Sequence, residues 1–446
     1  MRLFFSLGIC ALYFSLGIAQ PSYNLEQLYE LARHNNYAVK TAHHNIEEAQ
    51  LQRKEAFTNY FPNVSATGMW FNANKGMAET TLYPQEFIPQ ELGMALAQSM
   101  PPESLASLAN PIEVSMMKNG TIASVTAVQP VFAGGRIING NRLAKLGEDV
   151  SLLQLEMSEK EVERNVEKYF WQLASLQEKL KTIHVAQTYL DTIHKDASLA
   201  VQVGVAMRND LLQVQLRQND LASQKMKLNN AISIVKMLMT QYCGLKDTAF
   251  VITYDNEVLP PVSLKENHNL AVNNTTEHKL LTKQVEAAKL QEKITWGENL
   301  PSVAVGAGYN FHNLLDKNHS FAMVFATVSI PISGWWSGSH ATKRSKIETL
   351  KAQEQLTENT QLLIIGMENA WNGVEEAYNQ LQLSQLSIEQ ASENLRLNKD
   401  YYNAGISKMS DLLEAQLLYQ QACDRRTDAF IDYQNKALEY RHATGD

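Results

Sequence analysis

The chain lacks several residues and patterns that would mark common protein classes. Only three of its 446 residues are cysteines, Cys10, Cys243 and Cys423, and no two have metal-site spacing. The formal charge is −8 with no large basic block, which excludes a typical nucleic-acid-binding protein. Repeated apolar runs of about 20 residues are absent, which excludes a multi-span helical membrane protein. No nucleophile–base arrangement, phosphate loop or HExxH motif occurs, so we predict neither an enzyme nor a cofactor or metal site.

The first segment has the pattern of an export signal. Residues 1–19 contain one arginine, then an apolar run, and end in Gly17-Ile18-Ala19. Small residues therefore stand at positions −3 and −1 of a cleavage before Gln20, which predicts a secretory signal peptide. A membrane anchor is the alternative, but the run is short and no basic cluster follows it.

Proline is absent from two long stretches. All twelve prolines lie outside 131–259 and 332–446. Because an internal proline costs a helix about 3 kcal/mol, such gaps permit very long helices. Apolar residues recur at steps of three and four, as in a coiled coil. We predict long helices over about 137–200 and 340–403, each turned back by a glycine, Gly204 or Gly405, into a second helix.

The two proline-free stretches resemble each other at an offset of 201 residues. The matching pairs include Pro130 and Pro331, Glu167 and Glu368, Gly204 and Gly405, and Asp210 and Asp411. Upstream, Pro62 matches Pro301 at an offset of 239. The chain is therefore predicted to contain a signal peptide, a first repeat over 20–244, a linker over 245–263 and a second repeat over 264–446.

Each repeat is also predicted to contain two strands. They lie at about 62–72 and 121–130 in the first repeat, and at about 301–311 and 321–330 in the second. The two offsets differ by 38 residues, which places a 38-residue loop insert within 73–120. The fold class is mainly α with a small β part.

One strand has the alternation of a membrane-spanning β-strand. Its apolar positions are Val303, Val305, Ala307, Tyr309 and Phe311, and the residues between them are small or polar. About ten residues is the length of a tilted transmembrane strand, so we expect this face to contact lipid. A soluble hairpin with one buried face is the alternative. Open sheet edges are not tolerated in lipid, and four strands cannot enclose a pore, whereas three chains would supply twelve.

The duplicated layout, the stretch Gln129-Pro130-Val131-Phe132-Ala133-Gly134-Gly135-Arg136 and the paired glycine turns resemble the TolC family of outer-membrane efflux proteins. The resemblance implies a homotrimer in the outer membrane of a Gram-negative cell. A 12-stranded transmembrane β-barrel would be continued by a long coiled-coil α-barrel across the periplasm. Such a channel-tunnel is the exit duct for multidrug efflux or type I secretion, with a periplasmic adaptor protein and an inner-membrane pump as partners.

The resemblance also assigns roles to residues near the glycine turns. It implies an acidic ring at the periplasmic gate from Asp411 and Glu414, although the family usually has Asp where this chain has Glu414. It implies a closed-state latch from Asp210 and Tyr402, but Ser407 occupies the position of the latch arginine. The turns at Gly204 and Gly405 would be the tips where the adaptor docks. Helix capping by the acids and simple packing of Tyr402 remain the alternatives.

A second function stays open at this point. A periplasmic coiled-coil adaptor or scaffold without a pore would also contain long helices. Such an adaptor typically carries one helical hairpin flanked by compact β-domains. The two hairpins and four amphipathic strands predicted here favour the channel.

Overall fold

The computed structural model describes residues 20–254, 265–314 and 317–445. The predicted signal peptide and part of the predicted linker lie outside these residues. The chain divides into two compact units. The helical unit comprises the described residues of Met1–Glu48, Glu148–Val285 and Ala352–Asp446, and the sheet unit comprises those of Ala49–Gly147 and Glu286–Lys351. Each unit therefore takes segments from both predicted repeats.

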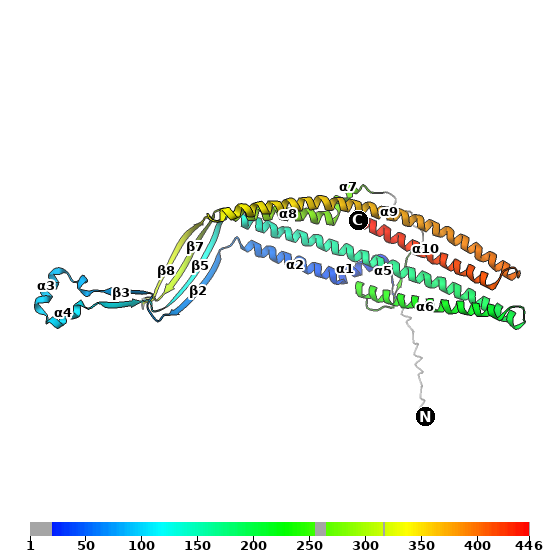
Figure 1. Ribbon diagram of the computed structural model, residues 1–446, viewed down its shortest axis with the longest axis horizontal. Helices are drawn as coiled ribbons and strands as arrows, with labels where there is room; N and C mark the ends of the chain where they lie inside the picture. The colour runs from blue at the N-terminus through cyan, green and yellow to red at the C-terminus, as the bar shows by residue number, and fades with distance from the viewer. Residues whose placement is uncertain (1–19, 255–264, 315–316, 446) are drawn as a thin grey trace, which may run out of the picture. The chain divides into compact units, whose positions relative to one another are not determined.

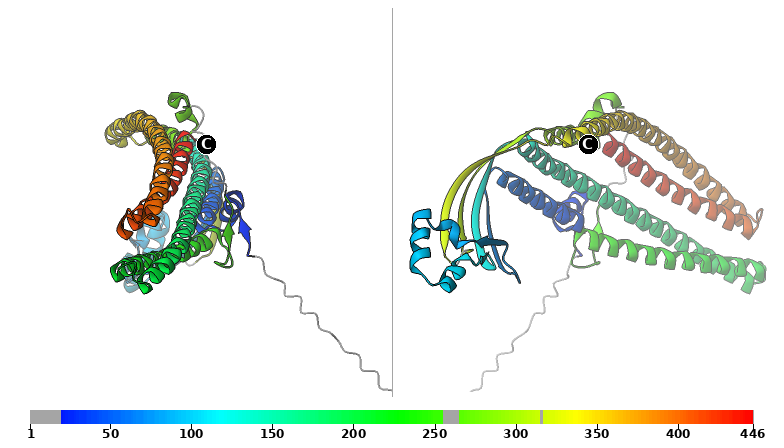
Figure 2. Two further views of the ribbon diagram at one scale, coloured as in Figure 1. Left: turned by 90° about the vertical axis from the view of Figure 1, so that its right-hand side faces the viewer. Right: turned by 60° about the vertical axis from the view of Figure 1, so that its left-hand side comes forward.

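The sheet unit contains a four-stranded antiparallel sheet (Figures 1 and 2). Its strands are β2 (Asn63–Asn72), β5 (Asn119–Ala133), β7 (Ser302–His312) and β8 (His319–Ser329), in the order β2-β5-β7-β8. The central β5–β7 pairing joins one repeat to the other. Its register shifts between Pro130 and Phe132, where the proline has no amide hydrogen to donate to the ladder. Each strand begins and ends within three residues of its predicted bounds.

The insert has secondary structure of its own rather than forming a plain loop. Strand β3 (Ala78–Leu82) pairs with β4 (Ile112–Met116), and three short helical segments lie between them in the chain. These are η1 (Pro84–Phe87), α3 (Gln90–Ser99) and α4 (Pro102–Ala109). Pro84 and Pro102 stand in the first turn of a helix, where the missing amide hydrogen has no cost. Its prolines therefore begin helices as well as interrupt them.

Two very long helices continue from the sheet unit into the helical unit. They are α5 (Arg136–Gln202) and α9 (Gly334–Asn403), and α9 begins six residues before its predicted start at residue 340. The glycine turns lead into α6 (Arg208–Cys243) and α10 (Met409–Thr444). The remaining helices are α1 (Leu25–Asn35), α2 (Tyr37–Thr58), α7 (His268–Ala271), η2 (Val272–Asn274) and α8 (Thr276–Gly297). Two residues of β1 (Ser22–Tyr23) pair in parallel with β6 (Val251–Ile252).

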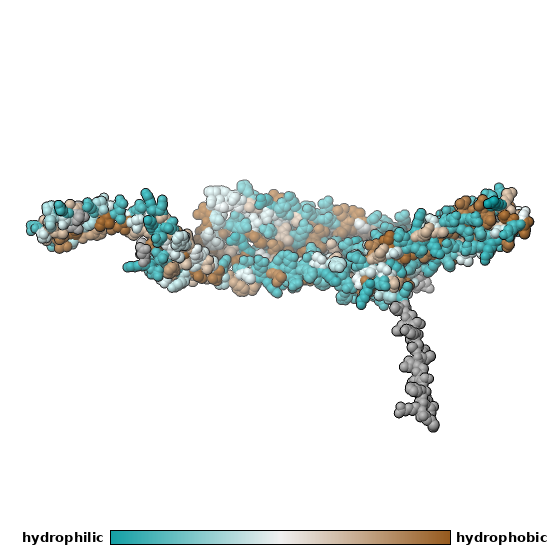
Figure 3. Space-filling model, turned by 90° about the horizontal axis from the view of Figure 1, so that it is seen from below, coloured by the Kyte–Doolittle hydropathy of each residue, from teal (hydrophilic) through white to brown (hydrophobic). Residues whose placement is uncertain are grey.

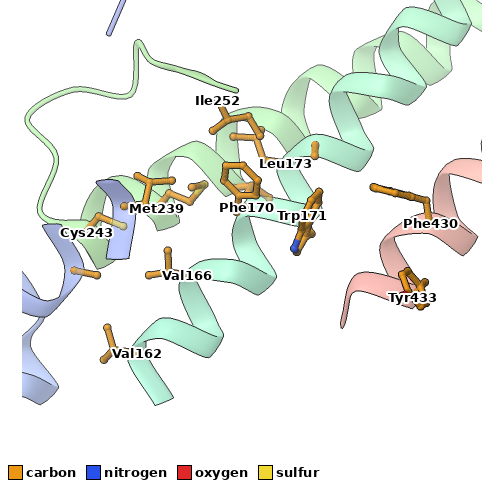
Figure 4. Close-up of a cluster of buried hydrophobic side chains, with 14 of the residues drawn as sticks. Val162, Val166, Phe170, Trp171, Leu173, Met239, Cys243, Ile252, Phe430 and Tyr433 are labelled. Atoms are coloured by element: carbon orange, nitrogen blue, oxygen red, sulfur yellow. The ribbon is translucent and has the colours of Figure 1, made fainter. Parts of the chain in front are cut away.

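The helical unit has two main apolar clusters. The larger centres on the stripe Val166, Phe170 and Leu173 of α5, which packs with Met239 of α6 (Figure 4). These residues are almost completely buried, as the helical spacing predicted for the three on α5. The smaller cluster lies toward the glycine turns and joins the two helical hairpins, α5–α6 and α9–α10. Its buried members are Ile183, Ala186, Leu190, Ile193, Ala197, Val214, Leu221, Met409, Leu412 and Leu413. No helix within the described ranges is long and apolar enough to span a membrane.

Candidate channel gate and membrane-facing sheet

The strand register gives the sheet one apolar face. The predicted lipid-facing residues of β7 line up mostly with alanine and valine on the neighbouring strands, with Phe132 opposite Val303 and the polar residues Gln129 and Ser320 opposite Val305 and Phe311. This face carries Val64, Ala66, Gly68 and Trp70 of β2, Ala123, Val125 and Ala127 of β5, Val303, Val305, Ala307, Tyr309 and Phe311 of β7, and Ala322, Val324, Ala326 and Val328 of β8. Large side chains on this face are exposed in the single chain, up to 86% for Val324. The predicted stripe on one strand is thus part of a four-strand apolar surface.

The opposite face is mostly polar or small. It carries the polar residues Asn63, Ser65, Thr67, Ser124, Thr126, Ser302, Asn310, His312, His319 and Thr327, and among them the large apolar residues Met69, Phe71, Ile122, Val128, Phe321, Met323 and Phe325. Phe325 lies over Gly306, where an added Cβ would be 2.4 Å from the ring. Glycine is therefore required at position 306 for the aromatic ring to lie flat on the strand.

The sheet has two unpaired edges. Within the part of the chain that the structure describes, β2 pairs only with β5 and β8 pairs only with β7. Each outer strand therefore has a free row of backbone hydrogen-bonding groups. An exposed apolar face combined with two open edges is unsuited to a water-soluble monomer, because both features favour association.

The two glycine turns have the same hydrogen-bond pattern. In each, the amide one residue after the glycine donates to the carbonyl five residues earlier. The pairs are Val205 to Ala200 at 2.9 Å and Ile406 to Tyr401 at 2.8 Å. Gly204 has φ +78° and Gly405 has φ +72°, the left-handed conformation that favours glycine at a helix end. The turns repeat at the offset of 201 residues found in the sequence.

The surface at the turns is apolar on the first hairpin in particular. Val203, Val205 and Met207 are each more than 70% exposed, and Ile406 is equally exposed on the second hairpin. Figure 3 shows apolar atoms in brown toward the right-hand end of the molecule, where the turns lie. Exposed apolar side chains beside a turn are typical of a contact surface.

Asp411 and Glu414 lie on one exposed face of α10. The residues between them, Leu412 and Leu413, are buried, so the two carboxylates point away from the helix packing. Asp411 also accepts a hydrogen bond from the Lys408 amide at 3.1 Å and thereby caps the helix. The structure therefore shows the capping role of Asp411 and leaves its carboxylate accessible.

The two predicted latch residues are neighbours but are not hydrogen-bonded to each other. Asp210 caps α6 by accepting a hydrogen bond from the Met207 amide at 3.3 Å, just as Asp411 caps α10. Tyr402 is half-buried beside the smaller apolar cluster. Burial raises the pKa of Tyr402, and the negative charges of Asp210 and Asp196 raise it further. The two hairpins thus come close together at this point.

A buried carboxylate with no role predicted from the sequence joins three helices. Glu167 of α5 is 2% exposed and accepts hydrogen bonds from Trp171 Nε1 at 3.1 Å and Arg441 Nη2 at 3.0 Å. It also accepts one from the Tyr29 hydroxyl of α1. Burial together with the nearby Glu167 charge raises the pKa of Tyr29. Glu167 therefore ties α1 and α10 to the middle of α5.

The repeat-related Glu368 has an equivalent but more exposed cluster. Its Oε2 lies 3.3 Å from His268 Nδ1, and its Oε1 accepts a hydrogen bond from Lys265 at 2.5 Å. Lys265 holds the pKa of Glu368 below its ordinary value. His268 follows Tyr29 by 239 residues, so both repeats place a side chain from this position against the matching glutamate. In the sequence, the only feature that pointed to these two clusters was the alignment of Glu167 with Glu368 between the repeats.

Comparison with known proteins shows one sequence match to a protein family and several matches in fold. Residues 279–446 match the family model "Outer membrane efflux protein". The C-terminal part of the chain therefore carries an outer membrane efflux protein domain, and the chain shares its fold with outer membrane channels. The family match falls within the second predicted repeat, and the structural likeness extends over almost the whole chain.

Three solved structures show the extent of that likeness. The outer membrane protein VceC from Vibrio cholerae is 12% identical, with a TM-score of 0.72 over 94% of this chain and 96% of VceC. The Campylobacter jejuni outer membrane channel CmeC is 16% identical, with a TM-score of 0.73 over 94% and 85%. The open state of the Neisseria gonorrhoeae channel MtrE is 13% identical, with a TM-score of 0.69 over 94% and 88%. At such identities the similarity establishes a shared fold. No curated protein matches this chain in sequence.

Proposed function

We propose that this chain forms a homotrimeric channel-tunnel that serves as the outer-membrane exit duct of a tripartite efflux or type I secretion system. The observation that carries the proposal is the four-stranded sheet with one apolar exposed face and two unpaired edges. In lipid, the apolar face needs no covering, but each edge needs a partner because water cannot satisfy its backbone groups.

Three copies satisfy this requirement. If β8 of each chain pairs with β2 of the next, twelve strands close into a barrel with no free edge. Twelve lies within the range of known closed membrane barrels. The polar face, with its serine, threonine and asparagine side chains, then lines the interior, and the apolar face contacts outer-membrane lipid. The long helices continue the duct across the periplasm.

The helical hairpins supply the contact with the rest of the pump. Val203, Val205 and Ile406 are exposed beside the turns at Gly204 and Gly405, and they offer apolar contacts to the hairpins of a periplasmic adaptor protein. The chain has no phosphate loop, so the energy for transport comes from the inner-membrane pump. If this chain were itself an adaptor or scaffold, the exposure of the apolar face of the sheet would have no explanation.

We assign the periplasmic gate to Asp411 and Glu414. Threefold symmetry brings six carboxylates toward one axis, where like charges oppose the entry of anions and favour the binding of cations. Capping by Asp411 is compatible with this role, because its carboxylate accepts the Lys408 amide at Oδ2 and the Ser410 hydroxyl at Oδ1 while the residue stays exposed. Asp210 and Tyr402 form the latch between the hairpins through their proximity rather than through a direct hydrogen bond.

The pore is tested with the purified mature protein. Chemical crosslinking of outer-membrane fractions should give a trimer, and the trimer should conduct ions in a planar lipid bilayer. A soluble monomer, or a membrane trimer that conducts no ions, would contradict the proposed channel.

The gate is tested by removing charge and keeping shape. The double substitution Asp411→Asn with Glu414→Gln retains oxygen acceptors, so the helix cap is preserved while six charges leave the trimer. We expect weaker block by divalent cations and weaker cation selectivity. Glu389→Gln, at an exposed acid on α9, is the matched control and should change neither property. Unchanged block in the double variant would refute the gate assignment. Tyr402→Ala removes the ring that packs beside the smaller apolar cluster, so it should raise basal conductance by weakening the proposed latch.

A further inference from the structure

Two histidines face each other at the loop end of the β7–β8 hairpin. His312 is the last residue of β7, His319 is the first residue of β8, and the two are directly opposite in the strand register. Directly opposed residues of antiparallel strands project on the same side of the sheet, so their side chains are neighbours. They lie on the polar face.

The spacing of the two rings suits a shared metal ion. Their centroids are 5.2 Å apart and their planes are inclined by 48°. A zinc–nitrogen bond of about 2.0–2.1 Å places each imidazole centroid about 3.2 Å from the metal, and a tetrahedral angle then separates the two centroids by about 5.2 Å. A small rotation of each side chain could therefore direct both lone pairs at one ion without moving the strands.

A second observation distinguishes this pair from ordinary ring packing. His312 Nδ1 is enclosed by protein and has no hydrogen-bond partner among the described residues. Buried polar atoms in proteins are nearly always paired, so an unpaired ring nitrogen beside a second imidazole indicates a missing ligand. Phe321 packs beside both rings, with centroids 6.5 Å from His312 and 5.9 Å from His319, and Ile122 is next to His312 in the register. These apolar neighbours would shield the metal bonds on one side.

We propose that His312 and His319 bind a divalent transition-metal ion of the zinc and copper class. Imidazole nitrogen suits these ions, whereas Mg²⁺ and Ca²⁺ require oxygen ligands. Nowhere in the described ranges do three or more histidine, cysteine or acidic side chains gather as a metal site, and two imidazole ligands leave coordination positions that water can fill. The ion links the two strands where they enter their loop. This location rests on the proposed function: in the trimer, three such sites line the channel wall near its outer mouth.

Calorimetric titration of Zn²⁺ into the detergent-purified mature protein, carrying a purification tag without histidine, tests the proposal. We expect one Zn²⁺ per chain, at least about tenfold weaker binding in His312→Gln or His319→Gln, and no binding at this site in the double variant. Anomalous scattering at the zinc edge should place the ion between the two rings. A Mg²⁺ titration should give no heat of specific binding.

His340→Gln is the matched control, because it removes one exposed histidine from α9 and leaves the pair intact. Absence of Zn²⁺ binding to the wild type, unchanged binding in the double variant, or an equal loss in the control would each overturn the proposal. The titration involves no conductance measurement. A failed pore assay would therefore leave the metal result standing, and a failed titration would leave the channel standing.

Discussion

A single charge placed on the apolar face of the sheet should block membrane insertion. Val324 is the middle residue of β8, lies opposite Ala307 on the apolar face and is 86% exposed. In the proposed barrel this side chain lies near the centre of the lipid. Arginine on the lipid face of a barrel costs about 2–4 kcal/mol at the midplane. Val324→Arg should therefore reduce the insertion equilibrium of each chain by roughly 30- to 900-fold.

The neighbouring position supplies a matched control. Met323 lies opposite Gly308 on the polar face and is also exposed in the single chain. Met323→Arg adds the same charge at nearly the same depth, but toward the water-filled interior. The assay is refolding of urea-unfolded protein into lipid vesicles across a denaturant series, with protease protection reporting the inserted fraction. Equal insertion of Val324→Arg and wild type, or equal losses in both variants, would refute the assignment of the two faces.

Further predictions concern the helical unit, with stability measured by urea unfolding of the purified protein. Gly405→Ala should lower the free energy of unfolding by about 1 kcal/mol, because φ is +72° at this position while the space around an added Cβ is open. The control Gly366→Ala, within α9, should raise the free energy of unfolding by about 0.5–1 kcal/mol. Glu167→Ala should lower the free energy of unfolding by about 3 kcal/mol, since it leaves the Trp171 N–H without a partner. Glu167→Gln should lower it less, because glutamine keeps an acceptor oxygen. Equal losses in the two variants would argue against a hydrogen-bonding role. Burial raises the pKa of Cys243 to about 12, so only about one thiol in ten thousand is ionised at pH 8. A thiol reagent should therefore label Cys243 only after unfolding. Rapid labelling of the native protein would contradict the burial of this residue.

Most of the secondary structure could be predicted because it depends on short-range rules. A proline-free stretch with apolar residues at steps of three and four favours a helix at almost every position, so α5 was predicted to within two residues at each end. The strand β7 was predicted from its two-residue alternation. The insert was predicted less well, since its prolines suggested a loop while two of them begin helices.

The candidate site could be predicted only in part. The positions of Gly204 and Gly405 follow from the conformation that a helix end needs. The exposure of Asp411 and Glu414 depends on which side of α10 packs, and the buried leucines between them show that side only in the folded chain. The role of these acids in a gate remains a prediction from the resemblance.

The sequence by itself determined the repeats, the long helices, the glycine turns and the alternation of the strands, because each is encoded by neighbours a few residues apart. The tertiary structure decided that the two repeats pair through β5 and β7, and it brought Arg441 to Glu167 and His268 to Glu368. Such contacts join segments that meet only after the chain has packed, so no local periodicity records them. The apolar face of the sheet combines both sources: alternation defined one stripe, and the register of four strands made it a surface.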